Sequence, residues 1–287
     1  MPTHRLDSAA LHHAFAVAAQ RVESSQLPFV ILGVANGAGT VRLEAATAPT
    51  SACRVGTNAV CLLASITKPI VATAALRLVE QGRLGLKAPL ADWLPELDTG
   101  DGRELITAWH VLSHTTGLDD EELETPLREG MGRDELLART LARPLVSAPG
   151  SVFRYATFTF ELLALAMERA TGQPLPEVLG ELVLDPLGMV DTVFDPGPER
   201  AARMAPVSLG QWSGTRLVGS EDAAVAADLR DRYTALRLAG GGLWSTAADL
   251  LRFGRAMLLG GELEGARVLS PAFAELATRE VTVDGLG

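Results

Sequence analysis

The sequence has 287 residues, of which 47% are hydrophobic and 21% charged, and it carries a formal net charge of -10 at pH 7. These values are typical of one large globular domain or two closely packed ones, and they exclude disordered, collagen-like and coiled-coil chains. The negative charge argues against a nucleic-acid partner, because affinity for a phosphate backbone comes from clustered Lys and Arg.

Targeting segments and metal sites leave no signal in the sequence. No apolar run reaches the ~18 residues that a membrane span needs, and the first residues do not follow the basic-then-apolar pattern of a signal peptide. We therefore expect a cytoplasmic protein with no membrane partner. The five histidines are scattered and the two cysteines fit no ligand spacing, so the sequence implies no metal and no cofactor.

The N-terminal part predicts a helix followed by an antiparallel β-hairpin. Apolar residues recur at helical spacing between Ser8 and Glu23. A continuous apolar run from Phe29 to Ala35 ends at Asn36-Gly37, a pair that tolerates the positive φ of tight hairpin turns. Apolar and polar residues then alternate between Val41 and Ala45, as expected for the returning strand.

Helices are predicted through the rest of the chain. A nearly all-apolar helix is expected from Ile66 to Val79, with Gly82 just past its end. Thr246 and Asp249 have the spacing of a capping box that opens a helix through Leu259. The middle of the chain shows helical periodicity without strand patterns in four segments: Arg103 to Leu112, Arg133 to Arg143, Thr159 to Thr171 and Leu175 to Leu184.

Ser65 and Lys68 stand three residues apart at the start of the first apolar helix, which places a hydroxyl and an amine on one face, one turn apart. A serine hydroxyl is a weak nucleophile until a neighbouring base removes its proton, and a buried lysine is one such base. Backbone N–H groups at the helix start would stabilise the oxyanion of an acyl-transfer intermediate. The alternative is a helix-capping serine beside a surface lysine, because Ser-x-x-Lys alone is common.

Four further segments favour the catalytic interpretation, because all five occur in the order and at roughly the spacing found in one known family. The five segments are ASITKP at 64–69, VLSHTTGL at 111–118, FRYAT at 153–157, DPLGMVDT at 185–192 and GGLWSTAADL at 241–250. Together they resemble class C β-lactamases and related esterases and D-amino-acid peptidases, within the serine β-lactamase and penicillin-binding-protein superfamily. The resemblance covers the chain from about Thr57 to its end.

The resemblance implies a role for each matched residue. Ser65 would be acylated, Lys68 would relay its proton, and Tyr155 would take the place of the tyrosine that shuttles protons during acylation and deacylation. A phenol has a pKa near ~10, so cations or strong donors must surround it before it can act as a base. The alternative for Tyr155 is a half-buried aromatic residue with a satisfied hydroxyl.

Three more residues, Thr157, Gly241 and Gly242, are implied to bind substrate. Thr157 departs from the family pattern, which has an Asn whose amide both donates and accepts hydrogen bonds. The positioning of the substrate or the lysine is therefore in question. His114 is expected to be a structural residue at a helix end or turn, because the family does not use that position as its base.

The family's third motif, a Lys-Thr-Gly or His-x-Gly strand, does not occur between Gly242 and Gly287. That strand supplies a second oxyanion N–H, and loss of one such donor lowers a rate by about two to three orders of magnitude. Without the later strands of the sheet, the hairpin from Phe29 to Ala48 would carry exposed edges that invite pairing. We therefore hypothesise a truncated chain, or one completed by another chain, with self-association as one form of such completion.

These observations predict a single β-lactamase-related domain over residues 1–287, of the α/β (α+β) class. A β-lactamase/DD-peptidase-like antiparallel sheet would be flanked by helices, with a helical subdomain at about 85–235 and the C-terminal strands missing. The expected function is a serine hydrolase that forms an acyl-enzyme at Ser65 and cleaves an ester, amide or β-lactam bond of a small molecule. The alternative is a catalytically impaired or silent relative that binds a ligand or partner.

Overall fold

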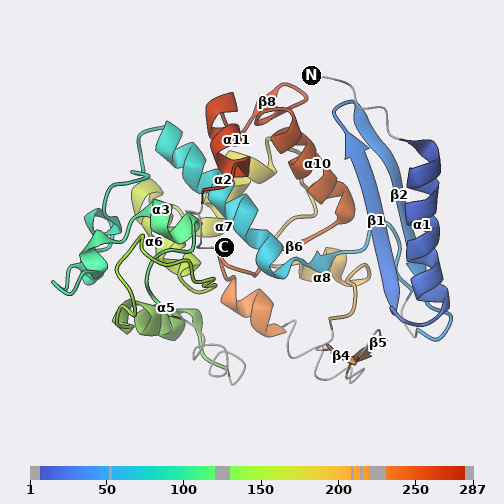
Figure 1. Cartoon of the computed structure of the whole chain (residues 1–287), viewed down its shortest axis with the longest axis horizontal. Coiled ribbons are helices and arrows are strands. Elements are labelled where there is room, and N and C mark those ends of the chain that lie inside the picture. Colours follow the sequence, from blue (N-terminus) through green and yellow to red (C-terminus); the bar gives the residue numbers. More distant parts are fainter. Residues whose placement is uncertain are drawn as a thin grey trace.

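The computed structural model describes residues 7–51, 54–119, 130–207, 210–213, 216–219 and 231–281. In Figure 1 an N-terminal hairpin with its helices lies on one side of the molecule and a group of helices from the middle of the chain lies on the other. Helix α2 (Thr67–Glu80) runs between these two parts. The predicted bounds, one domain over 1–287 with an insertion at about 85–235, stay a prediction.

Strands β1 (Phe29–Asn36) and β2 (Gly39–Thr47) form the antiparallel hairpin that the sequence predicts, with Phe29 opposite Thr47. The Asn36 side-chain oxygen closes the turn by accepting hydrogen bonds from the backbone N–H groups of Ala38 and Gly39, at 2.9 and 3.1 Å. A short polar side chain that bonds to its own turn is a common reason for Asn at such positions.

The two faces of the hairpin are covered by α1 (Ser8–Glu23) and α10 (Ala247–Leu258), as Figure 1 shows. Gly33 on β1 allows α10 to approach closely, because a Cβ at that position would lie 2.9 Å from the Leu251 side chain. A glycine inside a strand often marks such a close approach.

Helix α2 follows a 3₁₀ turn, η1 (Ala64–Ile66), and is buried on nearly all sides, as its sequence predicts. It packs against α6 (Phe160–Thr171), α7 (Leu175–Leu179) and α11 (Pro271–Thr278). The main apolar core of the described residues gathers around it. Gly82 has a φ of +69° just beyond its end, as expected for a glycine at that place.

The helical part consists mainly of short elements. In chain order they are η2 (Leu90–Asp92), η3 (Pro95–Leu97), η4 (Arg103–Leu105), α3 (Ala108–Leu112), α5 (Arg133–Ala142), α6, α7, η6 (Gly180–Leu184) and α8 (Gly197–Ala201). The prediction of one helix over Arg103 to Leu112 is wrong. Thr107 is extended and caps α3 through a reciprocal pair of hydrogen bonds with His110, so the segment divides at this residue.

The capping box predicted at Thr246 forms only in part. The Thr246 side chain accepts a hydrogen bond from the Asp249 N–H, but the Asp249 carboxylate bonds instead to the N–H of Asp191 and the hydroxyl of Thr192, at 2.8 and 2.9 Å. Burial raises the pKa of Asp249, against the opposing effect of these two hydrogen bonds. The start of α10 is thereby tied to the segment that follows η6.

The remaining strands form short antiparallel pairs, and one of these pairs positions the backbone on both sides of the candidate site. β3 (Cys61–Leu62) pairs with β6 (Trp244–Ser245), and the Leu63 N–H donates to the Leu243 carbonyl at 2.8 Å. This pairing brings the residues before α2 beside the glycine turn at 240–242. The other pairs are β4 (Gly210–Ser213) with β5 (Arg216–Gly219) and β7 (Glu262–Leu263) with β8 (Ala266–Arg267).

The described residues contain neither a membrane-spanning helix nor a metal-binding cluster. None of the helices in these residues is both long and apolar enough to cross a membrane. The same residues hold no group of three or more His, Cys, Asp or Glu side chains arranged to bind a metal ion.

Candidate active site

Ser65 lies in the 3₁₀ turn that leads into α2, and its side chain is exposed. The residue before it, Ala64, has a φ of +46°, a left-handed conformation that is unfavourable for any residue with a Cβ. Backbone strain of this kind concentrates at functional sites, where the surrounding structure holds it in place. The turn presents Ser65 at the start of a helix whose first N–H groups have no partner within the helix.

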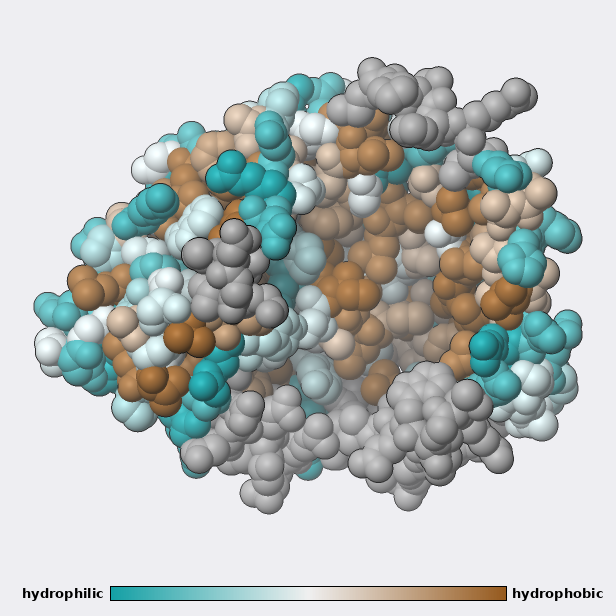
Figure 2. Space-filling model, viewed as in Figure 1, coloured by the Kyte–Doolittle hydropathy of each residue, from teal (hydrophilic) through white to brown (hydrophobic). Residues whose placement is uncertain are grey.

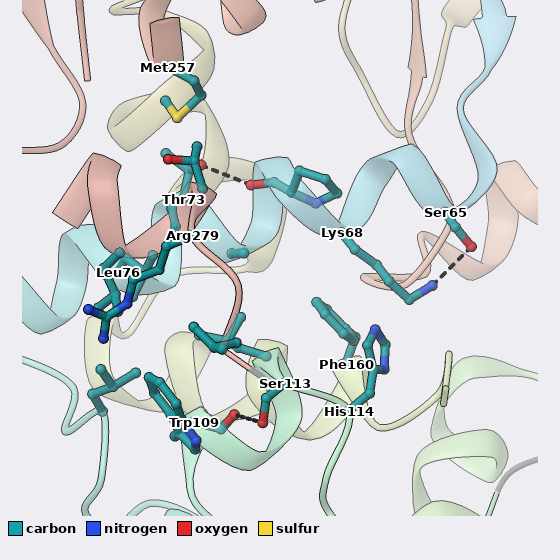
Figure 3. Close-up of a pocket in the computed structure, with 18 of the residues that line it drawn as sticks. Ser65, Lys68, Thr73, Leu76, Trp109, Ser113, His114, Phe160, Met257 and Arg279 are labelled. Atoms are coloured by element: carbon teal, nitrogen blue, oxygen red, sulfur yellow. Dashed lines mark hydrogen bonds between the residues drawn. The ribbon is translucent and has the colours of Figure 1, made fainter. Parts of the chain in front are cut away.

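The amine of Lys68 contacts a serine, a threonine and a backbone carbonyl. Its Nζ lies 3.1 Å from Ser65 Oγ, 3.4 Å from Thr157 Oγ1 and 2.7 Å from the Gly240 carbonyl oxygen. Figure 3 shows the Lys68 side chain extended toward Ser65, with the contact between the two groups drawn as a dashed line. Lys68 is only 5% exposed, so the alternative of a surface lysine is wrong.

Tyr155 stands over the Ser65–Lys68 pair, with its ring centre 4.9 Å from Lys68 Nζ. Burial raises the pKa of the Tyr155 phenol, but hydrogen bonds with Ser65, Lys68 and Thr157 and the charge of Lys68 outweigh that effect and leave the pKa below its ordinary value. The ring is half exposed and its hydroxyl is satisfied, as in the plainer interpretation. The partners that satisfy it are nevertheless those that a proton shuttle requires.

The imidazole ring of His114 packs against the ring of Tyr155. The two rings lie 4.4 Å apart at a tilt of 32°, and His114 Nδ1 accepts a hydrogen bond from the Ala156 N–H at 3.2 Å. Burial, and then the charge of Lys68, lower the pKa of His114 to about 4. The ring is therefore neutral at pH 7, and because Nδ1 accepts a hydrogen bond, its proton is on Nε2. The structure places His114 in the turn after α3, with a φ of +55°, as the sequence predicts.

The three glycines at 240–242 have different surroundings. A Cβ on Gly240 would lie 2.4 Å from the Thr157 carbonyl oxygen, and one on Gly242 would lie 2.5 Å from the Leu238 nitrogen. A Cβ on Gly241 would meet only Ala64, at 3.6 Å, which is an ordinary contact. Of the two glycines predicted to bind substrate, Gly241 thus lies beside the backbone that precedes Ser65, whereas Gly242 packs against its own turn.

A pocket of about 530 Å³ opens beside the Ser65–Lys68 pair. This volume is in the usual range for small-molecule sites. In Figure 3 its lining extends from Ser65 along α2 to Leu76 and Arg279, and Figure 2 shows a hollow lined largely by apolar residues over α2 and α10. Most of the lining side chains are apolar: Pro69, Ala72, Leu76, Leu86, Trp109, Leu112, Phe160, Phe253, Met257, Leu276, Ala277 and Val281.

Two residues that shape the site were not among the predicted ones. Gly240 contributes its carbonyl oxygen to Lys68, and Glu161, which is 1% exposed, accepts a hydrogen bond from the neighbouring Ala239 N–H at 2.6 Å. The sequence did contain one signal for Glu161. It is a lone carboxylate in the apolar start of α6, and a charge that a helix buries there needs a partner.

A comparison with protein families places nearly the whole chain in one family. The family model described as Beta-lactamase matches residues 15–287. This chain belongs to the Beta-lactamase family. The predicted membership of this superfamily is therefore confirmed, and it rests on nearly the whole chain rather than on the Ser-x-x-Lys motif.

Two curated relatives illustrate the range within the Beta-lactamase family. The chain is 39% identical over 221 residues to the esterase EstB of Burkholderia gladioli, an alignment that covers 66% of this chain and 55% of EstB. It is 27% identical over 214 residues to the D-alanyl-D-alanine-carboxypeptidase/endopeptidase AmpH of Escherichia coli, covering 72% of this chain and 51% of AmpH. The chain thus spans little more than half the length of these relatives.

Solved structures confirm the predicted β-lactamase/DD-peptidase-like α/β fold. EstCE1, a hydrolase with promiscuous acyltransferase activity, matches with a TM-score of 0.74 and 22% identity, over 93% of this chain and 76% of that one. The simvastatin synthase LovD from Aspergillus terreus matches with a TM-score of 0.73 and 24% identity, over 95% of this chain and 72% of that one.

Proposed function

We propose that this chain is a serine hydrolase that forms an acyl-enzyme at Ser65. The observation that carries the proposal is the 3.1 Å contact between Lys68 Nζ and Ser65 Oγ, made by a buried amine that also lies 4.9 Å from the centre of the Tyr155 ring. A nucleophile within hydrogen-bond reach of a base, which a third group orients, is the arrangement that activates a serine.

In the proposed acylation, Ser65 Oγ attacks the carbonyl carbon of the substrate and its proton passes to the Lys68–Tyr155 pair. The tetrahedral intermediate places its oxyanion near the backbone N–H of Ser65, at the positive end of the helix dipole, which stabilises negative charge. The bond to the leaving group then breaks, the leaving group takes the proton from the pair, and the acyl group stays on Ser65 as an ester.

Water completes the proposed cycle. It attacks the carbonyl carbon of the acyl-enzyme and gives a proton to the Lys68–Tyr155 pair, and the bond to Ser65 Oγ breaks. Ser65 recovers its proton and the carboxylic acid leaves. These steps use only the side chains of this chain and the water.

An ester with an apolar acyl or alcohol group is the substrate that the site supports best. Most side chains that line the pocket beside Ser65 are apolar, and burial of each CH₂ group contributes about 0.8 kcal/mol. The relative EstB is named an esterase, and AmpH is named a peptidase that acts on D-alanyl-D-alanine bonds. Amides and β-lactams are therefore secondary candidates within the same proposed chemistry.

Covalent labelling tests the proposal. A fluorophosphonate probe is expected to add one probe mass to the intact wild-type chain, at Ser65, and nothing to Ser65→Ala. p-Nitrophenyl acetate and nitrocefin turnover, measured beside it, separate esterase from β-lactamase activity. Equal labelling of the two proteins would refute the nucleophile. A folded wild-type chain that takes up no probe would support the alternative of a silent relative.

A further inference from the structure

Glu161 is a buried carboxylate close to the site but outside the proposed proton relay. It is the second residue of α6 and is 1% exposed, with apolar neighbours on both sides in the sequence. A buried charge is costly unless hydrogen bonds or an opposite charge compensate for it. The partners of Glu161 therefore indicate what its burial achieves.

Those partners lie on both sides of the carboxylate. One oxygen accepts a hydrogen bond from the Ala239 N–H at 2.6 Å, and the neighbouring Gly240 N–H lowers the pKa of the carboxylate against the larger effect of burial, which raises it. The other oxygen faces Arg133 Nε at 3.3 Å, and Arg133 also reaches Glu168, with Nη2 at 3.3 Å from its nearer oxygen. Arg133 thus balances the charge, while the backbone donors fix the direction of the carboxylate.

The residue after Ala239, Gly240, accepts a short hydrogen bond from Lys68. The Gly240 carbonyl oxygen lies 2.7 Å from Lys68 Nζ, which is shorter than the 3.1 Å to Ser65 Oγ and the 3.4 Å to Thr157 Oγ1. Gly240 also packs closely against Thr157, because a Cβ at position 240 would lie 2.4 Å from the Thr157 carbonyl oxygen. Gly240 therefore lies between Thr157, against which it packs, and Ala239, which Glu161 holds.

We infer that Glu161 is a positioning residue: by accepting the hydrogen bond from the Ala239 N–H, it holds the chain next to Gly240, whose carbonyl keeps Lys68 against Ser65. Its effect on acylation depends on the proposed function, whereas its effect on the Lys68 amine does not. A misplaced base slows a reaction strongly even when every reacting group is present.

Two double variants separate the acceptor role of Glu161 from its charge. Arg133→Met/Glu161→Gln and Arg133→Met/Glu161→Leu both remove the buried ion pair, and their new side chains are of similar size. Only the glutamine side chain keeps an oxygen that accepts from the Ala239 N–H. We expect fluorophosphonate to label the double variant with Glu161→Gln (the Gln variant) at a rate within about threefold of wild type. The double variant with Glu161→Leu (the Leu variant) should be labelled at least about tenfold more slowly, which is the effect that loss of a hydrogen bond of this kind produces.

Glu168→Gln is a further control, because it weakens the Arg133 pair and leaves the Ala239 contact in place. We expect it to acylate at the wild-type rate. Thermal unfolding of all variants shows which of them are folded at the assay temperature, and the split of turnover into kcat and KM adds a second test. A positioning defect lowers kcat with little change in KM.

The reactivity of Lys68 provides a measurement that needs no turnover. Lys68 and Lys87 are the only lysines in the sequence, and Lys87 is exposed. Competitive acetylation with acetic anhydride, followed by peptide mass spectrometry, gives the reactivity of Lys68 relative to Lys87. We expect this ratio to rise about tenfold in the Leu variant and to stay near the wild-type value in the Gln variant.

The two measurements distinguish the inference from the proposed function. If the Lys68 ratio rises only in the Leu variant while wild type takes up no fluorophosphonate, Glu161 positions Lys68 and the hydrolase proposal is wrong. If wild type is labelled at Ser65 and the two double variants agree in both labelling and Lys68 reactivity, the positioning inference is overturned.

Discussion

Lys68 Nζ lies 3.4 Å from the hydroxyl oxygen of Thr157, the residue that stands where the resemblance leads one to expect Asn. The hydroxyl provides the acceptor that the lysine needs, although a threonine has no second polar atom to offer a substrate. Thr157, whose departure from the family pattern put the positioning of the lysine in question, therefore still contacts Lys68.

The first prediction concerns this contact. Thr157→Val keeps the shape of the side chain and removes its oxygen, so we expect acylation by p-nitrophenyl acetate to slow by about fivefold to tenfold, the value of one such hydrogen bond. Thr157→Asn restores an acceptor and adds a donor, so it should acylate at least as fast as wild type. Pre-steady-state burst kinetics measure both rates. Unchanged acylation in Thr157→Val would show that Gly240 alone positions the amine.

The second prediction concerns the ionisation of Tyr155. A nearby cation favours the negative phenolate, so the hydrogen bonds and charge of Lys68 lower the pKa of Tyr155, and Lys68→Ala should raise it. The sequence holds only two tyrosines, Tyr155 and Tyr233, so the ultraviolet titration of each protein minus its Tyr155→Phe counterpart isolates Tyr155. We expect a midpoint below 10 in wild type and a higher one in Lys68→Ala. Equal midpoints would contradict the coupling.

Tyr155→Phe also tests the proton relay. If the phenol moves protons in the transition state, its loss should slow acylation by about 10²-fold, the low end of what general acid–base catalysis contributes. The ring contact with Lys68 remains in the variant. Fluorophosphonate labelling at the wild-type rate would leave Lys68 as the sole base.

The third prediction links His114 to stability at low pH. Its pKa is about 4 in the folded chain and near 6.5 when unperturbed, so between these values the unfolded chain binds a proton that the folded chain does not. The free energy of unfolding therefore falls as the pH falls through this window.

The control for this prediction is His114→Asn, because Asn tolerates the φ of +55° and offers an oxygen to the Ala156 N–H. Denaturant unfolding of both proteins from pH 7.5 to pH 4 measures the difference in their free energies of unfolding. This difference should be constant above pH 7 and should shift against the wild type below it. A constant difference throughout would contradict the lowered pKa.

The sequence predicted the local structure of this chain well where a single segment determines it. The hairpin follows from its turn and alternation, and α2 follows from a nearly all-apolar run. The segment 103–112 divides because the Thr107 side chain competes for the backbone of its own helix, a local effect that apolar periodicity does not reveal.

The site was predicted from a motif, whereas its support depends on distant contacts. Ser65 and Lys68 are one turn apart, so their 3.1 Å contact follows from helix geometry. Gly240 is 172 residues from Lys68, and Glu161 is 78 residues from Ala239. Nothing in the spacing of single residues indicates such pairs, because packing of α6 against α2 and the β3–β6 pairing create them.

The fourth prediction concerns the acyl group. Because the pocket beside Ser65 is mainly apolar, kcat/KM should rise from p-nitrophenyl acetate to the butanoate and hexanoate, by up to about fourfold for each CH₂ that becomes buried. Met257→Gln replaces an apolar lining side chain by a polar one of similar length. It should reduce this gain and leave acetate turnover unchanged. A flat or falling series in wild type would exclude the pocket as the acyl site.

The fifth prediction compares two neighbouring glycines. A Cβ at Gly240 would lie 2.4 Å from the Thr157 carbonyl oxygen, so Gly240→Ala must move the carbonyl that holds Lys68. Overpacking of this kind costs about 1–3 kcal/mol, and we expect a lower Tm together with a large loss of kcat. At Gly241 the nearest contact of an added Cβ is 3.6 Å, so Gly241→Ala should keep the wild-type Tm.

The comparison also tests whether Gly241 binds substrate. Its added methyl group would stand beside Ala64, next to the nucleophile, so substrate contact at this position should raise KM while kcat changes little. Thermal unfolding measures the Tm of each variant, and steady-state kinetics with p-nitrophenyl butanoate measure its kcat and KM. If Gly241→Ala matched wild type in KM as well as in Tm, the glycine would serve the turn alone. If Gly240→Ala kept the wild-type kcat, its carbonyl would not be what positions Lys68.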